Sequence, residues 1–265
     1  GYPAVAIAKM KLAFAALLAG SAAAFAPQEA GRVATSLNIG TPGSSWGATL
    51  GPSPQGGSVG DQQRILGQTR RTWQFPDINQ ELVEVDMTSD GRPMYADVQL
   101  WIGPDWTPMT MKTYSYDGYK RPLKCIIGTR NKQATIEVKN TGSYELPITC
   151  TAAYAKPPFS DLRNELPSKV EGAYVEGGGA VHSVTFDPTV EQAQILLKTD
   201  LRQLNAKVEV LNAPNNYKQT FEIFTNNGVL NSLYVVVDTP QASNTVRVRN
   251  IAPLEFPFRA YISEV

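Results

Sequence analysis

The sequence contains a duplication whose two copies stay in one register. ADVQLWIGP begins at Ala96 and AKVEVLNAP begins at Ala206, which sets an offset of 206 − 96 = 110 residues. Without a gap, the same offset aligns Glu145-Leu146-Pro147 with Glu255-Phe256-Pro257. Chance similarity between two β-rich stretches would not hold one register this long. We therefore predict two copies of one structural unit.

Each copy has the pattern of an all-β unit. Its apolar segments are short, rich in β-branched and aromatic residues, and bounded by Gly, Pro, Asn or Asp. TIEVK and TVRVR alternate apolar with charged residues, which is typical of strands with one buried face. Six or more strands per copy need a second sheet to cover that face. The predicted fold class is all-β: two tandem, pseudo-symmetric β-sandwich repeats after a disordered targeting segment, with no helix in the mature part.

The front of the chain predicts an import signal. Lys9 and Lys11 precede an apolar run and then small residues, which is the layout of a signal peptide with cleavage near Ala24. The run is too short for a permanent membrane anchor. Residues 25–65 are rich in Gly, Ser, Thr and Pro without a periodic apolar pattern, so we expect them to be disordered.

The predicted organisation has four parts. Residues 1–65 form the signal and transit presequence, and residues 66–155 form the first β-sandwich repeat. Residues 156–172 form a linker that begins with Pro157-Pro158, and residues 173–265 form the second repeat.

The charge balance narrows the classes of partner. Lys and Arg together number 24, as do Asp and Glu, so the formal net charge is zero. A neutral chain has little long-range attraction for nucleic acid or for an anionic membrane, and neither is an expected partner. Neutrality also removes the repulsion between copies, which favours self-association.

The residues that usually carry chemistry are sparse. His182 is the single histidine, and no motif for a catalytic nucleophile or a bound nucleotide accompanies it. Cys125 and Cys150 fall in strand-like segments, where buried free thiols are the simpler interpretation and a disulfide stays open. We therefore expect a protein that is not an enzyme and has no cofactor and no metal.

Two ligand-binding alternatives remain open at this stage. Three acidic residues close together in sequence could form a calcium site: Asp86, Asp90 and Asp97. Exposed aromatic side chains on a β-sandwich can also bind sugars, with Trp101, Trp106 and Trp73 as the candidates. The alternative function is therefore a carbohydrate- or ligand-binding module.

The C-terminal segment LEFPFRAYISEV is a candidate contact between copies. Its large apolar side chains are expected to be covered partly by their own sandwich and partly by a neighbouring subunit, and the alternative is that they only complete their own core. The candidate interface residues are Trp101, Trp106, Glu255, Phe256, Phe258, Tyr261 and Ile262.

Several segments together resemble a known family. They are QTRRTW, DGRPMYADVQLWIGPDWTP, TIEVKNTGSYELP, NTVRVRN and LEFPFRAYI, and the leader segment AAFAP resembles the bipartite plastid presequence of algae such as diatoms. From about residue 68 onward the chain resembles the pyrenoid shell proteins of diatoms and related algae.

The resemblance implies a structural role without catalytic residues. Members of that family tile into a thin protein sheet around the Rubisco-rich pyrenoid and help to limit the escape of CO₂. The implied location is the plastid stroma at the periphery of the pyrenoid. The implied partner is a second copy of the chain in a sheet or tube, with a paralogue as a further candidate and the Rubisco matrix as an indirect neighbour.

Overall fold

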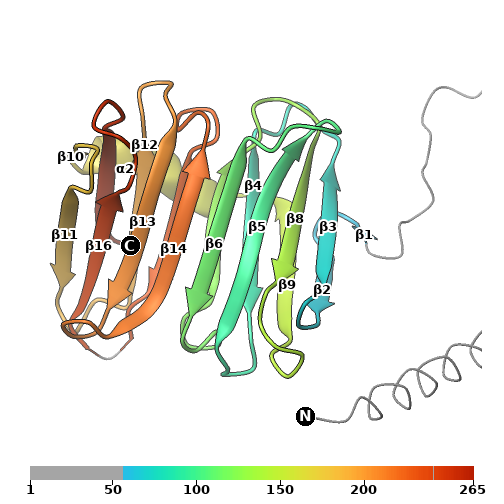
Figure 1. Cartoon of the computed structure of the whole chain (residues 1–265), viewed down its shortest axis with the longest axis horizontal. Helices are drawn as coiled ribbons and strands as arrows, with labels where there is room; N and C mark the ends of the chain where they lie inside the picture. The colour runs from blue at the N-terminus through green and yellow to red at the C-terminus, as the bar shows by residue number, and fades with distance from the viewer. Residues whose placement is uncertain (1–55, 241) are drawn as a thin grey trace, which may run out of the picture. The chain divides into compact units, whose positions relative to one another are not determined.

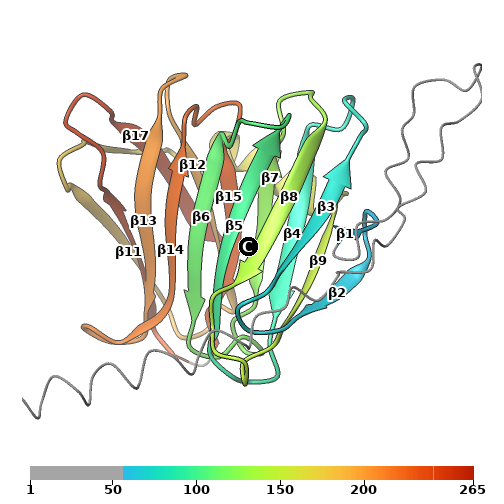
Figure 2. The same ribbon diagram turned by 45° about the vertical axis from the view of Figure 1, so that its right-hand side comes forward.

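The computed structural model describes residues 56–240 and 242–265, so most of the predicted leader lies outside the described residues. The described strands form two sheets that pack face to face (Figures 1 and 2). Neighbouring strands are antiparallel throughout, except that β1 runs parallel to β3. The fold is nearly all β, as the alternating sequence pattern predicted.

The two sheets differ by one strand within the described residues. In spatial order, the nine-stranded sheet contains β1 (Gly56–Gly57), β3 (Arg70–Phe75), β8 (Ala134–Asn140), β5 (Met94–Ile102), β6 (Met109–Ser115), β14 (Tyr217–Thr225), β13 (Leu204–Leu211), β16 (Asn244–Asn250) and β11 (Val181–Phe186). The eight-stranded sheet contains β10 (Ala173–Val175), β17 (Phe258–Glu264), β12 (Gln192–Lys198), β15 (Leu233–Asp238), β7 (Leu123–Gly128), β4 (Leu82–Thr88), β9 (Ile148–Tyr154) and β2 (Gln62–Ile65).

The predicted equivalence of the repeats is confirmed. Ala96 in β5 pairs with Asn140 on one side and with Thr113 on the other. Ala206 in β13 pairs with Asn250 and with Ile223, which are the strand positions that the offset predicts. β5 and β13 therefore occupy the same place in their repeats.

The two repeats are fused along both sheets. β6 pairs with β14, and the pair Lys112–Glu222 at the centre of that ladder joins residues that are themselves 110 apart. β7 pairs with β15 in the same way around the pair Cys125–Val235. A pseudo-two-fold axis therefore passes through both sheets, and each sheet continues from one repeat into the other (Figure 1).

The core follows from the alternation along the strands. In β8 and β16 every second residue is buried, and the side chains between them face solvent. The buried apolar side chains of both repeats join one continuous cluster between the sheets, which includes Val98, Val208 and Phe221. Burial of this cluster is the main driving force for closing the sandwich.

The linker holds a helix that the sequence analysis did not predict. α2 (Phe159–Lys169) lies on the outer face of the eight-stranded sheet (Figure 1). Its apolar side chains Phe159, Leu162 and Leu166 recur at helical spacing, and the sheet offers them an apolar surface. The segment is short and has prolines beside it, so its helical spacing of apolar residues did not predict a helix.

The β-structure also begins before the boundary that we predicted at residue 65. β2 pairs with β9, Ile65 is fully buried, and the indole nitrogen of Trp73 donates to the backbone oxygen of Asp61 over 3.1 Å. Residues 56–65 are thus part of the sandwich. The sequence pattern does not predict these strands, because they consist mainly of glycines and polar residues and such short edge strands bury few side chains.

Candidate functional site

The structure does not bring together a catalytic or metal-binding constellation in its described part. His182 lies in the edge strand β11, opposite Val248. No group of three or more His, Cys, Asp or Glu side chains among the described residues is placed to hold a metal ion. Nor is any described helix long and apolar enough to cross a membrane.

The candidate calcium ligands are separated. Asp86 lies on the outer face of the eight-stranded sheet in β4, whereas Asp97 lies in β5 of the other sheet. Asp90 belongs to the exposed turn between these strands. The three carboxylates therefore do not converge, and the calcium alternative is wrong for this set.

Both cysteines are free and buried in the core. Cys125 is in β7 and Cys150 is in β9, with β4 between them. Two strand spacings amount to about 9–10 Å, which is beyond the reach of a disulfide. Burial raises the pKa of both thiols, so neither is a reactive thiolate.

The candidate tryptophans do not form an exposed aromatic platform. Trp73 is fully buried, and Trp101 is half-buried opposite Thr135. Trp106 is half-buried, and the guanidinium of Arg130 lies 4.8 Å from its ring centroid. A sugar could not stack on these rings as they stand, so the structure gives the carbohydrate-binding alternative no support from these residues.

The predicted interface residues of the C-terminal segment are dispersed. Phe258 and Ile262 are buried in the apolar core cluster of their own sandwich, on the inner face of β17. They are therefore not available to a partner, which corrects that part of the prediction. Tyr261 and Phe256 are half-buried and Glu255 is exposed.

The two ends of the nine-stranded sheet are different. At one end, β1 lies along the outer side of β3. At the other end, β11 pairs only with β16 within the described residues, although it occupies the place of β3 in the second repeat. β11 carries no Lys, Arg, Asp, Glu or Pro over its length, VHSVTF. Such an edge is a template for pairing with another strand.

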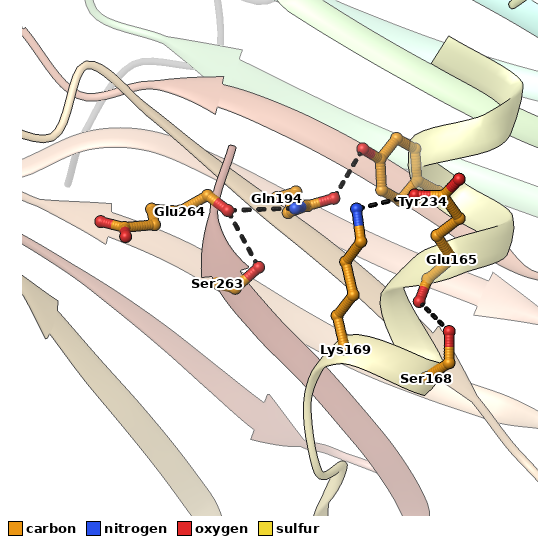
Figure 3. A network of polar contacts seen from close by, with 7 residues as sticks. All are labelled: Glu165, Ser168, Lys169, Gln194, Tyr234, Ser263 and Glu264. Atoms are coloured by element: carbon orange, nitrogen blue, oxygen red, sulfur yellow. Dashed lines mark hydrogen bonds and ion pairs between the residues drawn. The ribbon is translucent and has the colours of Figure 1, made fainter. Parts of the chain in front are cut away.

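The outer face of the eight-stranded sheet also differs between the two repeats. α2 covers Leu196, Tyr234 and Val236 of the second repeat together with Ile126 of the first. The ring of Phe159 contacts that of Tyr234 edge-on with a centroid distance of 5.3 Å. Figure 3 shows the adjoining polar network, in which the Tyr234 hydroxyl donates to Gln194 over 3.0 Å. The helix and this network cover the outer face of the eight-stranded sheet in the second repeat.

The equivalent face of the first repeat carries ionisable groups. Asp86 occupies the place of Leu196, Glu84 that of Gln194, and Lys124 that of Tyr234, all at the offset of 110. Burial raises the pKa of the Asp86 carboxyl, although the charge of Lys124 opposes this. Burial, and then the charge of Asp86, raises the pKa of Glu84. This face is therefore polar yet partly desolvated.

Two large clefts lie at the ends of the strands. The first, of about 860 Å³, adjoins the start of β4, the end of β7 and α2, and Arg130, Lys132 and Arg163 are among its lining residues. We call it the basic cleft. The second, of about 700 Å³, adjoins the start of β12 and the end of β15. We call it the acidic cleft, because Glu191, Asp238 and Glu264 line it.

A large apolar side chain is exposed at the same place in each repeat. Tyr144 follows β8 and is 77% exposed, and Leu254 follows β16 and is 71% exposed. They are 110 residues apart, so the pseudo-two-fold axis relates them. A single exposed apolar side chain is normal on a protein surface. Its recurrence at the equivalent position of both repeats makes this pair a candidate contact between copies.

Comparison with known proteins identifies one matching family. A family model described as "Diatom pyrenoid shell protein" matches residues 56–264. A search of curated protein sequences finds no match. Among solved structures, the PBSX exported protein XepA is similar at 6% identity, with 76% of this chain and 85% of that chain covered and a TM-score of 0.28. The tandem CBM22 domain of Paenibacillus barcinonensis Xyn10C is similar at 12% identity, with 77% and 86% covered and a TM-score of 0.22.

Proposed function

Because the chain belongs to the diatom pyrenoid shell protein family, we propose that it is a structural protein that assembles with copies of itself into a sheet around the pyrenoid. The sheet would enclose the Rubisco-containing matrix, lie in the plastid stroma and help to retain CO₂ for fixation. A paralogue with the same edges is a further candidate partner, and the Rubisco matrix is an indirect neighbour. The proposal assigns no enzymatic activity to the chain.

The family match over the whole sandwich carries this proposal, and the open edge of β11 supports it. An uncharged edge strand of six residues exposes a row of backbone donors and acceptors, and a monomeric protein usually blocks such a row. The exposed pair Tyr144 and Leu254 adds equivalent apolar contacts on both repeats. A pseudo-symmetric unit with contacts on several sides can propagate in a plane.

The test is microscopy of the purified chain from residue 56 onward, since β1 and β2 belong to the sandwich. We expect sheets or tubes in negative stain. If the protein stays a monodisperse monomer by light scattering at all concentrations, the proposal is wrong.

A matched pair of variants tests the edge. Ser183 in β11 pairs with Arg247, and Thr72 in β3 pairs with Glu137, the residue equivalent to Arg247. Ser183→Lys should raise the concentration needed for sheets roughly tenfold, equal to about 1.4 kcal/mol, because an edge lysine opposes strand pairing. Thr72→Lys is the control, because β1 already covers that edge. Equal effects of both variants would remove β11 from the proposal.

A further inference from the structure

The basic and acidic clefts are the same place in the two repeats. Glu81 of the basic cleft corresponds to Glu191 of the acidic cleft at the offset of 110. Gly128 likewise corresponds to Asp238, and Leu230 corresponds to Lys120, with the repeats exchanged. The pseudo-two-fold axis therefore carries one cleft onto the other.

The charges of the two clefts are opposite in spite of this equivalence. The basic cleft has three cationic side chains, Arg130, Lys132 and Arg163, against Glu81. The acidic cleft has three carboxylates against one cation. Its ionisable residues are Glu191, Asp238, Glu264 and Lys120. A duplication would begin with equal charges in both repeats, so the two repeats now differ in the sign of charge at equivalent places, and α2 adds Arg163 to the basic cleft alone.

The clefts lie at opposite ends of the strands. β7 and β15 are antiparallel neighbours, and Ile127 at the end of β7 pairs with Leu233 at the start of β15. The basic cleft adjoins the end of β7, and the acidic cleft adjoins the end of β15. The strand β15 has six residues, so about 20 Å of sheet separates the two ends.

The exposed charges of both clefts are free to contact a partner. Lys132, Glu191 and Glu264 are exposed. None of the ion pairs within the described part of the chain involves them. Arg130 is held more firmly, because it donates to Asn231 and Asn226 and lies over Trp106. Lys132 also lies near the Trp106 ring, with its Nζ 5.9 Å from the centroid, but it is exposed and has no ion-pair partner among the described residues.

We propose that the basic cleft of one copy docks against the acidic cleft of the next copy, so that copies join head to tail along the strand direction. The inference rests on the proposed self-assembly and names one of its contacts. A single copy cannot bring its own clefts together, whereas two copies can match positive to negative without a like-charge clash. The contact uses different surfaces on the two partners, so it propagates as an open row where the rotation between successive copies does not close a ring.

The test is a charge swap at the two exposed positions. Lys132→Glu alone and Glu191→Lys alone each place like charges across the contact. We expect each to raise the concentration needed for assembly about tenfold or more. The double variant restores opposite charges and should return that concentration to within about threefold of the unchanged chain. Lys139→Glu, an exposed lysine on the outer face of β8, is the control and should have little effect.

Salt gives an independent measurement on the unchanged chain. Raising ionic strength from 0.15 M to 1 M shortens the screening length from about 8 Å to about 3 Å, so assembly through this contact should weaken. If the single reversals have no effect, or if the double variant fails to recover while circular dichroism shows the native fold, the inference is wrong and the proposed function stands. Polyglutamate is a probe for an acidic peptide as the alternative partner. If polyglutamate binds at Lys132 and the charge reversals leave assembly unchanged, the proposed contact between copies is wrong as well.

Zero-length carbodiimide cross-linking separates the inference from the proposed function. The clefts of one copy are too far apart for a direct link, so a bond between Lys132 and Glu191 or Glu264 must join two copies. We expect this bond in mass spectra of small oligomers, even under conditions in which no sheet forms. Absence of sheets together with this cross-link would reject the shell but keep the contact. Sheets without this cross-link would reject the contact.

Discussion

The two repeats share an internal skeleton and differ on their surfaces. In the first repeat, the buried Asn140 side-chain amide donates to the backbone oxygens of Ile65 and Leu146. In the second, Asn250 donates to Val175 and Phe256, each partner being shifted by 110 residues. The repeats differ in the residues on the outer face of the eight-stranded sheet, in the covering of the edge strands β3 and β11, and in the charge of the two clefts.

This contrast indicates which parts of the duplicated unit are constrained by folding. A buried amide that links three backbone groups tolerates little change, because each lost partner leaves a desolvated polar group. A surface position is free to change unless something covers it. The surface differences between the repeats are therefore the places to look for contacts with α2 and with other copies.

The largest effect should come from exchanging the residues that distinguish the two outer faces. Leu196 is fully buried in the apolar cluster that α2 covers, whereas its counterpart Asp86 is a half-buried carboxylate. Leu196→Asp should lower the free energy of unfolding by about 4 kcal/mol, because it removes a buried apolar side chain and places a carboxylate in an apolar cluster. Urea unfolding of the unassembled chain measures it.

The reverse exchange is the control for that comparison. Asp86→Leu should change the free energy of unfolding by less than about 1 kcal/mol, since the position is only partly covered. Limited proteolysis near Phe159 should accelerate in Leu196→Asp and stay unchanged in Asp86→Leu, because only the first variant releases α2. Similar losses for both variants would mean that the two faces are not different in the way the structure indicates.

A smaller but equal effect is expected within the shared skeleton. Asn140 also accepts from the backbone nitrogen of Gly142, and Asn250 accepts from that of Ala252. Asn140→Ala and Asn250→Ala each remove three hydrogen bonds and leave their partners unsatisfied, so each should lower the free energy of unfolding by roughly 3 kcal/mol. Denaturant titration of both variants checks the value.

The agreement between these two variants matters more than the size of either loss. Because the bonds are equivalent and both repeats belong to one sandwich, the two losses should lie within about 1 kcal/mol of each other. If only one of the two substitutions lowered the free energy of unfolding, the repeats would not contribute equally to stability. The continuous sheets predict that they do contribute equally.

Sequence alone could give the repeat and most of its strands. The constant offset of 110 and the alternation in segments such as β8 and β16 depend only on local pattern. The shortest strands and α2 escaped, because they bury few side chains and their patterns are brief. The place of β11 escaped as well: it matches β3 at an offset of 111, since Thr72 and Ser183 pair with Glu137 and Arg247.

The candidate site was less accessible from sequence, because it depends on which strands meet. Nothing in the residues shows that β6 meets β14 and β7 meets β15, so the opposite placement of the clefts could not be inferred. Period-2 spacing put Phe258 on a strand face but could not show that this face is the core. The sequence shows which residues are charged or apolar, but it does not show which residues they contact in the fold.

The smallest expected effect is a pH dependence confined to the first repeat's outer face. Asp86 and Glu84 have raised pKa values in the folded chain, with burial as the leading cause. A carboxyl whose folded pKa exceeds its unfolded pKa stabilises the fold while it is protonated, and this contribution is lost as pH rises through the folded pKa. The pair therefore weakens the fold at neutral pH relative to mildly acidic pH.

Asp86→Asn keeps the shape of the side chain and removes this charge. Because the second repeat has uncharged Gln194 and Leu196 at the equivalent places, the variant makes the first repeat resemble the second. We expect a gain in the free energy of unfolding of roughly half to one kcal/mol at pH 7.5, reduced by the solvent that still reaches the carboxyl. The gain should shrink toward zero near pH 4, where the native Asp86 is increasingly protonated. Thermal unfolding of both chains at the two pH values measures it, and a loss at pH 7.5 would show instead that the charged carboxylate, held by Lys124, stabilises this face.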